Sequence, residues 1–561
     1  METAVAITDR MKYGVKPSAV RSENYLHNIK ASNGSTFKCQ MGQDIIFDVP
    51  ALGNGYYCDF STSYFRMKVD VTMTTALTAA AGTTVKTGNG YVRFERGPES
   101  MFRRVMIQDA SGNLLESFEN YNDLYCLTEL LSDSRQNREG FSAFHGEGLK
   151  LPGNTVPIVV SAAAGNNATS VDVSPFAVNV NAAGTYKING KYPTLNYPSL
   201  GGAIIANYGM GDSTDLINPT EYKFGAYSLF NQDYNIQSTT YTQGKSGGRY
   251  YTFQLLSSLF GGCAEKYLPM SAINGMRIIF SMENVNGAFV QNGLMSGAGG
   301  ATANPIQEIN VYDPTFFLNM VRVDPTVDQQ LIKSAQSPED GNIRIHSQTY
   351  SSFQMSILAN QANFEYVIPI KVSSLKAIYF TFAPTSWSNS ESFDQTDYMC
   401  ALGSKATYNG TRVMKTSWFQ NNLANYQFFL DGKPTPASPV NVRIGFSETL
   451  AELARALHFG HKSADGNYLS LLEDNGTYQE QNFVLGQEFE SFSQKGPVIE
   501  SGINTLNSLL SLRLNFNTAG HVPGQVAVQS GNFEGCYLKI FCLYDSFLSI
   551  TPGTGIMRTE T

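Results

Sequence analysis

Charged residues are scarce in this chain of 561 residues: Asp, Glu, Lys and Arg together make up 15 % of it, against about 25 % in an average soluble domain. The 47 acidic residues outnumber the 39 Lys and Arg residues, and the net charge is −8. A negative molecule repels polyanions, so contact with nucleic acid is expected only locally. The sequence also lacks any apolar run of the roughly 18 residues that a membrane-spanning helix needs.

Cysteine is also sparse, and its spacing excludes two common uses. The seven cysteines are scattered, with no C-x-x-C pair and no histidines at a zinc-binding distance. The first ten residues lack the basic segment and the apolar segment of a secretory signal. We therefore expect reduced thiols in a protein that is synthesised in the cytoplasm and not secreted.

The residues that are abundant favour β-structure. Hydrophobic residues make up 42 % of the chain, which excludes disorder as its main state, and 50 Gly, 22 Pro, 30 Tyr and 35 Phe suit short strands joined by turns. Apolar and polar residues alternate along 65–71, 276–283 and 510–517, which predicts strands with one wet face. The segments 377–382 and 538–543 are nearly continuous apolar runs, as in strands covered on both faces. The predicted fold class is all-β.

Three helices are predicted among the strands. Segments 120–134 and 447–459 carry one apolar stripe each and should lie against a sheet edge. A third helix should begin at Pro325 behind the N-cap Asp324 and run to about residue 335. The turn-rich segment 337–341 follows, and we place a domain boundary there.

The two sides of that boundary repeat the same order of elements. Each side has strands, one amphipathic helix, an Ile-Asn pair before an alternating strand (Ile273 and Ile503), and a closing aromatic-rich strand (311–318 and 537–544). This predicts two sandwiches of similar size. The expected divisions are an N-terminal arm (1–36), a first sandwich (37–323) with an insertion at about 148–248, an interdomain helix and linker (324–341), a second sandwich (342–550) and a C-terminal tail (551–561).

Two segments fall outside the repeat. The insertion 148–248 is rich in Gly, Asn, Ala, Pro and Tyr and poor in charge, so we expect a surface excursion that neighbouring copies partly cover. The first thirty residues are mildly basic, which suits contact with nucleic acid, an anionic membrane or a neighbouring subunit, and equally an ordinary flexible terminus.

Motifs for catalysis are weak throughout the sequence. Gly244-Lys-Ser246 resembles the end of a phosphate-binding loop, but Thr239 stands where the loop needs its first glycine, so a Gly-rich turn is favoured. There is no G-x-S-x-G elbow for a serine hydrolase.

The histidines and paired carboxylates give no stronger signal for chemistry. His458 and His461 lie at the end of the predicted helix 447–459, where capping of the terminal carbonyls is favoured over metal binding. His346 has no second histidine near it. Glu488 and Glu490 point to the same face of a strand. We interpret them as part of a solvated face and not as the acid pair of a glycosidase. We predict no catalytic residue, no metal site and no cofactor, and hence no enzyme.

The order and length of these elements resemble the double jelly-roll major capsid proteins of icosahedral double-stranded DNA viruses, with the virophage and polinton-like virus group the most similar. The resemblance covers about residues 37–550. It is carried by segments 267–270, 274–278, 374–382 and 538–541.

This resemblance implies two tandem eight-stranded jelly-roll sandwiches and a homotrimeric, pseudo-hexameric capsomer that tiles the shell of the virion. Three copies of two similar domains approximate sixfold symmetry. It also implies contacts with neighbouring capsomers, with penton and minor capsid proteins, and of the N-terminal arm with an inner membrane or the genome. The alternatives are a carbohydrate-binding or adhesive jelly-roll protein and, in third place, a glycoside hydrolase that uses Glu488.

Overall fold

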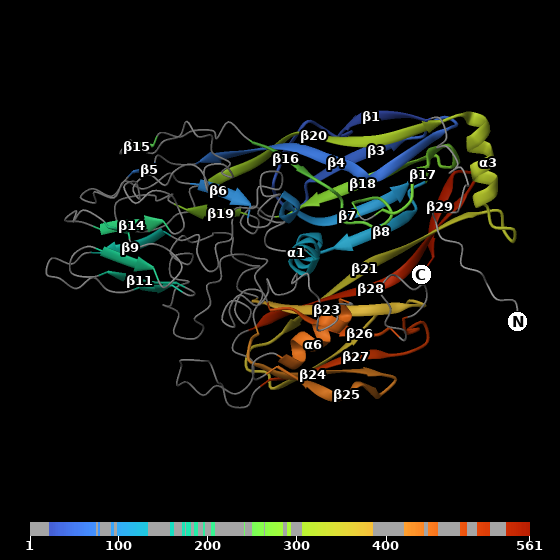
Figure 1. The fold of residues 1–561 in the computed structure, drawn as a ribbon. Coiled ribbons are helices and arrows are strands. Elements are labelled where there is room, and N and C mark those ends of the chain that lie inside the picture. The colour runs from blue at the N-terminus through green and yellow to red at the C-terminus, as the bar shows by residue number, and fades with distance from the viewer. Residues whose placement is uncertain are drawn as a thin grey trace, which may run out of the picture.

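The protein consists of two β-sandwiches, one above the other in Figure 1. The computed structural model describes residues 22–73, 77–78, 91–94, 98–132, 157–161, 171–173, 176–180, 185–188, 195–196, 203–207, 240–241, 249–262, 264–283, 289–292, 306–384, 420–442, 447–457, 483–490, 502–516 and 535–560.

The first sandwich packs two antiparallel sheets face to face. One sheet has the order β1 (Ser22–Lys30), β20 (Ile306–Val323), β4 (Tyr56–Met73) and β16 (Arg249–Phe253). At its margins β2 (Thr36–Lys38) pairs with β20 and β17 (Leu268–Pro269) pairs with β4. The other sheet has the order β3 (Asp44–Pro50), β18 (Gly275–Met282), β7 (Phe102–Asp109) and β8 (Leu114–Glu119).

The second sandwich is built in the same way. One sheet has the order β21 (Ile343–Ile357), β28 (Cys536–Thr551), β23 (Leu375–Pro384) and β26 (Leu485–Glu488), with β29 (Ile556–Glu560) paired to β28. The facing sheet has the order β22 (Asn363–Ile368), β27 (Leu510–Phe516), β24 (Leu423–Leu430) and β25 (Lys433–Asn441).

The strand order is identical in the two domains. If the eight main strands of each domain are numbered along the chain, both domains have one sheet ordered 1-8-3-6 and a second ordered 2-7-4-5. Ile273 and Ile503 both precede the seventh strand, and the two aromatic-rich segments lie in the eighth. The predicted duplication and the all-β class of two eight-stranded jelly rolls are confirmed.

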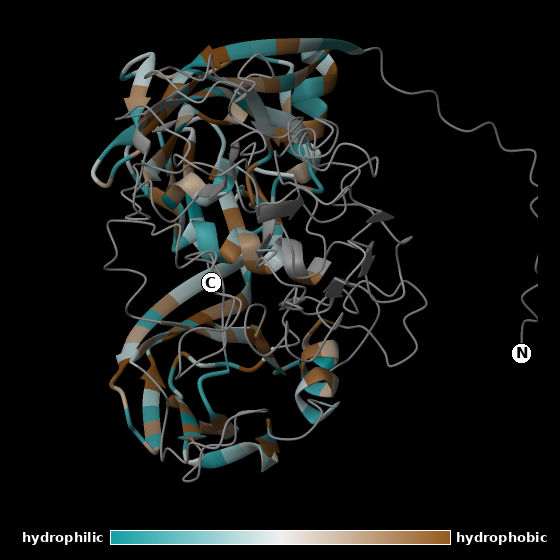
Figure 2. Cartoon of the chain, turned by 90° about the vertical axis from the view of Figure 1, so that its left-hand side faces the viewer, coloured by the Kyte–Doolittle hydropathy of each residue, from teal (hydrophilic) through white to brown (hydrophobic). Residues whose placement is uncertain are grey.

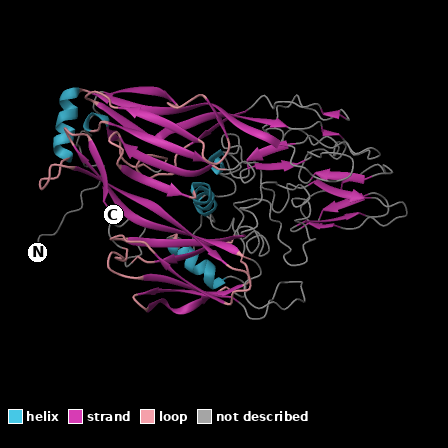
Figure 3. Ribbon diagram, turned by 180° about the vertical axis from the view of Figure 1, so that it is seen from behind, coloured by secondary structure: helices cyan, strands magenta, loops and turns pink. Residues whose placement is uncertain are grey.

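All three predicted helices are present. The linker helix α3 (Pro325–Ala335) begins and ends where predicted, and the Asp324 side chain caps it by accepting a hydrogen bond from the Thr326 amide at 2.8 Å. Helices α1 (Tyr121–Ser132) and α6 (Ser447–Ala456) each connect the fifth and sixth strands of their domain. Figure 3 shows α1 between the two sandwiches and α6 against the second one. The described residues also include two short 3₁₀ helices: η2 (Pro98–Met101) and η4 (Met270–Ala272).

Aromatic side chains fill the core of each sandwich, as the alternation predicts. Phe65 of β4 stacks on Phe316 of β20 at 4.2 Å between ring centroids and meets Phe280 of β18 edge-on at 4.9 Å. In the second domain Phe380 meets Tyr426 edge-on at 5.0 Å. Figure 2 shows the resulting stripes of hydrophobic and hydrophilic residues along the strands. Nearly all buried apolar residues of both domains belong to one continuous cluster, so the contact between the domains is part of the core.

Parts of the predicted arm and tail lie in the sheets. Residues 22–30 of the arm form β1, which pairs with β20 over its full length. Residues 556–560 of the tail form β29, which pairs with β28. Residues 1–21 lie outside the described residues.

Short strands lie beyond the sandwiches, at the end opposite α3 (Figure 1). Within the insertion, β9 (Pro157–Ser161) pairs with β14 (Ala203–Asn207), and the order β10 (Val171–Val173), β11 (Phe176–Val180), β12 (Thr185–Ile188), β13 (Leu195–Asn196) forms a small sheet. Two more pairs join separate connections of the first domain: β15 (Thr240–Tyr241) with β5 (Leu77–Thr78), and β19 (Phe289–Asn292) with β6 (Tyr91–Phe94).

Candidate functional site

The contact between the two domains joins different faces of the repeated fold. Helix α1 and strand β8 of the first domain pack on β21 and β28 of the second. Lys539 of β28 donates to Asp123 of α1 at 2.5 Å, and both side chains are buried. The Ser352 hydroxyl of β21 donates to the backbone carbonyl of Glu119. The fifth strand of one domain therefore lies next to the first strand of the other.

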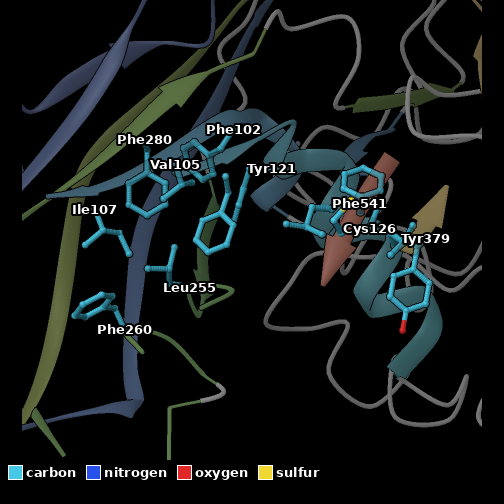
Figure 4. Packing of buried hydrophobic residues seen from close by; sticks show 14 of the residues in the cluster. Phe102, Val105, Ile107, Tyr121, Cys126, Leu255, Phe260, Phe280, Tyr379 and Phe541 are labelled. Carbon is cyan, nitrogen blue, oxygen red and sulfur yellow. The ribbon is translucent and has the colours of Figure 1, made fainter. Parts of the chain in front are cut away.

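The apolar part of this contact covers a cross-strand aromatic pair. Tyr379 of β23 lies opposite Phe541 of β28, and Figure 4 shows Cys126 of α1 beside them. Tyr379 is 3 % exposed and Phe541 is fully buried. The Tyr379 hydroxyl donates to the Ala456 carbonyl of α6 at 2.8 Å, and burial raises the pKa of this phenol well above its usual value.

A carboxyl group is buried in the same contact. Glu116 of β8 accepts a hydrogen bond from the Ser257 hydroxyl at 2.6 Å and faces Thr349 and Tyr544 of the second domain. Its second oxygen, Oε1, has no hydrogen-bond partner within the described part of the chain. Burial raises the pKa of Glu116 to about 7, against the opposing effect of hydrogen bonds from Ser257 and Thr349.

The outer face of the first domain also carries an aromatic pair on its third and eighth strands. We use "outer face" for the side of β20, β4 and β16 that points away from the core, with Tyr64, Arg66, Lys68, Tyr250 and Phe317. Tyr64 lies opposite Phe317 and stacks on it at 4.9 Å between centroids. The Arg66 guanidinium lies 4.7 Å from the Phe317 centroid and 5.3 Å from that of Tyr250. Tyr250 is 54 % exposed.

The prediction of a solvated face at Glu488 and Glu490 is wrong, because both side chains are only 5 % exposed. Lys376 donates to Glu490 at 2.6 Å and lies 3.5 Å from Asp545. Arg455 of α6 lies 3.3 Å from Glu488. Glu490 is held by the buried Lys376, and Glu488 by Arg455, whose side chain is 55 % exposed. Both glutamates therefore belong to a structural ion-pair network.

His346 has a carboxylate partner that sequence reasoning did not find. Its Nε2 lies 3.0 Å from Asp545 Oδ1, while the Ser374 hydroxyl donates to Asp545 Oδ2 at 2.7 Å. This network joins β21, β28 and the start of β23. His458, His461 and Gly244–Ser246 lie outside the described residues, so their predicted roles in capping and in a turn stay predictions.

Within the described ranges, no three His, Cys, Asp or Glu side chains converge as a metal site. Five described cysteines are buried and unbridged, as predicted: Cys39, Cys58, Cys126, Cys536 and Cys542. Burial raises the pKa of the Cys39 thiol to about 12, which makes it a poor nucleophile. Among the helices that the structure describes, none combines the length and apolar character needed to cross a bilayer.

Solved structures of viral proteins share this fold along nearly the whole chain. The structure of the Sputnik virophage by cryo-EM contains a chain that is 11 % identical, with 100 % of this chain and 93 % of that chain covered and a TM-score of 0.54. PBCV-1 VP54, fitted into a cryo-EM reconstruction of the virophage Sputnik, is 10 % identical, with 98 % and 99 % covered and a TM-score of 0.51. No protein-family model and no curated protein matches the sequence. The chain has the double jelly-roll fold of viral major capsid proteins.

Proposed function

We propose that this protein is a major capsid protein: three copies form a pseudo-hexameric capsomer, and capsomers tile the icosahedral shell of a double-stranded DNA virus. The observation that carries the proposal is the exact repetition of the 1-8-3-6 and 2-7-4-5 sheets within one chain. Three copies of two equal lobes make a six-lobed block, which can pack in a hexagonal array. The likeness in fold to the Sputnik virophage chain supports the same role.

A shell protein is held in place by many moderate contacts with other copies. Each capsomer would meet several neighbours, and moderate contacts become durable because later contacts form within a tethered array. The protein would act by burial and multivalency, without catalysis and without a cofactor. It would be made in the host cytoplasm and serve in the virion.

The remaining parts of the proposal concern segments outside the two sandwiches. The insertion at about 148–248 would form an outward projection and contribute to trimer contacts. Residues 1–21 would face the interior, where an inner membrane, the genome or minor capsid proteins lie, and penton proteins would fill the vertices. The divisions at 37–323, 324–341 and 342–550 would act as first lobe, linker and second lobe, with β1 (22–30) added to the first lobe and β29 (556–560) to the second.

The test is the size and shape of the purified protein. Light scattering coupled to gel filtration should give three times the chain mass of 61.5 kDa, and electron microscopy should show particles with six lobes. A monomer at high concentration, with binding to a glycan array, would refute the proposal and favour the adhesive alternative. Replacing residues 148–248 with a short turn should leave folded sandwiches and weaken trimers, and intact trimers would refute the role given to the insertion.

A further inference from the structure

The second domain completes one of its sheets with a strand that has no counterpart in the first domain. In the first domain the third strand, β4, pairs with the eighth strand, β20, along residues 306–322. In the second domain the third strand, β23, pairs with β28 only as far as Tyr544. Strand β29 pairs with the next part of the same edge, at residues 547–551. It therefore covers backbone groups of β28 that would otherwise lie at an open sheet edge.

The turn before β29 is bonded to the first domain. Asn274 lies between η4 and β18, and its backbone N–H donates to the Gly555 carbonyl at 3.4 Å. Its side-chain amide donates to the Thr554 carbonyl. Strand β29 itself lies next to β8 of the first domain (Figure 1). A segment that belongs to the second domain by its ladder thus also contacts the first domain at two places.

The contact at Asn274 leaves no room for a side chain on this turn. Gly555 is buried and has a φ angle of +68°, which favours glycine. A Cβ atom there would lie 2.4 Å from Asn274 Cγ and 2.7 Å from the Asn274 backbone nitrogen. Gly553 of the same turn has a φ angle of +90°, but no described atom beyond its chain neighbours lies within 4 Å of such a Cβ. The two glycines share a backbone requirement, and Gly555 is the one packed against the first domain.

Strand β29 is anchored by burial as well as by its ladder. Met557 is fully buried and belongs to the apolar cluster that both domains share. The eight main strands of each domain precede β29 in the chain. Because domains fold in the order in which they are synthesised, β29 can dock only after the strands of both sandwiches have been made.

This attachment is the second one between the domains. The linker 324–341 joins them covalently, and two domains with a single linker tend to move relative to each other. We propose that residues 551–560 form a clasp, which closes on Asn274 and β8 once both sandwiches have formed and fixes the arrangement of the two lobes from which capsomers assemble. The part that concerns assembly rests on the proposed function.

Hydrogen exchange tests whether the clasp holds the domains together. The Gln348 amide of β21 donates to the Ser258 hydroxyl of the first domain at 3.1 Å, so it reports on opening of the domain contact. In Gly555→Ala we expect this amide to exchange at least about tenfold faster than in the wild type. Amides of the β24–β27 ladder should keep their wild-type rates, since they lie within the second domain. Gly553→Ala is the matched control, with a similar φ requirement and no contact to lose, and should leave the Gln348 rate nearly unchanged.

A second variant keeps the test decisive if Gly555→Ala also disturbs the ladder amides. Asn274→Ala retains both glycines and removes the donor to the Thr554 carbonyl, so it should accelerate exchange at Gln348 in the same direction. Wild-type exchange at Gln348 in both variants would overturn the clasp, and so would equal acceleration in Gly553→Ala.

Sedimentation velocity of the same full-length variants tests the link to assembly. The dissociation of trimers should increase by at least about tenfold in Gly555→Ala and stay near the wild-type level in Gly553→Ala. Trimers of wild-type strength in a Gly555→Ala protein with fast exchange at Gln348 would overturn the role in assembly. A wild-type protein that stays monomeric would overturn the capsid proposal, and the exchange rates would still decide whether the clasp holds the domains.

Discussion

Lys539 of β28 and Asp123 of α1 form an ion pair across the contact between the two jelly rolls, with side chains that are 6 % and 3 % exposed. They are separated by 416 residues in sequence. A buried pair contributes little net stability compared with a well-packed apolar pair, but the loss of one partner is costly. We therefore expect this pair to favour one relative position of the two domains.

Lys539→Met should destabilise the protein by about 3–5 kcal/mol, because it leaves the Asp123 carboxylate buried without its cation. Calorimetry should show a lower midpoint and a broader or split transition, since the domains lose part of their coupling. Arg277→Met is the control: its pair with Asp48 is about half exposed, and such pairs contribute about 0–1 kcal/mol. Equal midpoints for the two variants would contradict this role of Lys539.

Glu116 should make stability depend on pH. Its pKa is about 7 in the folded protein against an ordinary value of 4.5, so the folded state binds more protons between these values. Below about pH 4.5 the neutral carboxyl contributes its full stabilisation to the folded state. This contribution is lost as the pH rises through about 7, and the free energy of unfolding falls by about 3 kcal/mol in total. Glu116→Gln should remove this loss. Urea unfolding at pH 5 and pH 8 measures it.

Glu119, on the same strand, provides the control for the Glu116 substitution. Glu119 is half exposed and pairs with Arg104, so Glu119→Gln should leave the slope of stability against pH nearly unchanged. Tyr544, whose own pKa burial raises to about 12, stays protonated in this range. If Glu116→Gln and wild type lost equal stability between pH 5 and pH 8, Glu116 would not be the group responsible.

Lys376→Met should be among the most destabilising single substitutions in the second domain. It removes the ammonium group that faces Glu490 and Asp545, in a cluster where all three side chains are at most 5 % exposed. The expected loss is about 3–5 kcal/mol. Lys371→Met nearby removes an exposed lysine that donates to the Ser508 carbonyl and should cost much less. Chemical denaturation measures the free energy of unfolding of both variants. Similar losses of stability would show that Lys376 does not stabilise the buried network.

The strands and the linker helix were predictable because their signals are local. Asp324 followed by Pro325 fixes the start of α3 through capping and a preset φ angle. Apolar and polar residues alternate along β4 because one face of the strand lies on the core and the other does not. The repeated strand order follows from two similar sets of such local signals.

The burial of Glu488 and Glu490 was not predictable from alternation, which says which residues share a face but not what covers that face. Here Arg455 of α6 and Lys376 cover them. A signal was nevertheless present. Lys539 lies inside the apolar run 538–543, and Lys376 directly precedes the run 377–382; both runs were predicted to be covered on both faces. A lysine in such a place needs a buried carboxylate. The partner's identity depends on tertiary contacts.

Asp328 ties the linker helix to the first domain, and its loss should loosen that attachment. Its carboxylate accepts hydrogen bonds from the Gly55 amide and the Tyr57 hydroxyl, both at 2.8 Å, and the residue is 1 % exposed. Asp328→Ala should destabilise the protein by about 2–3 kcal/mol, because the Gly55 N–H is left buried without an acceptor. Asp324→Ala, which removes only the exposed cap, should cost about 1 kcal/mol. Thermal unfolding of both variants measures the difference. An equal or smaller loss for Asp328→Ala would mean that packing of α3, and not this carboxylate, holds the linker in place.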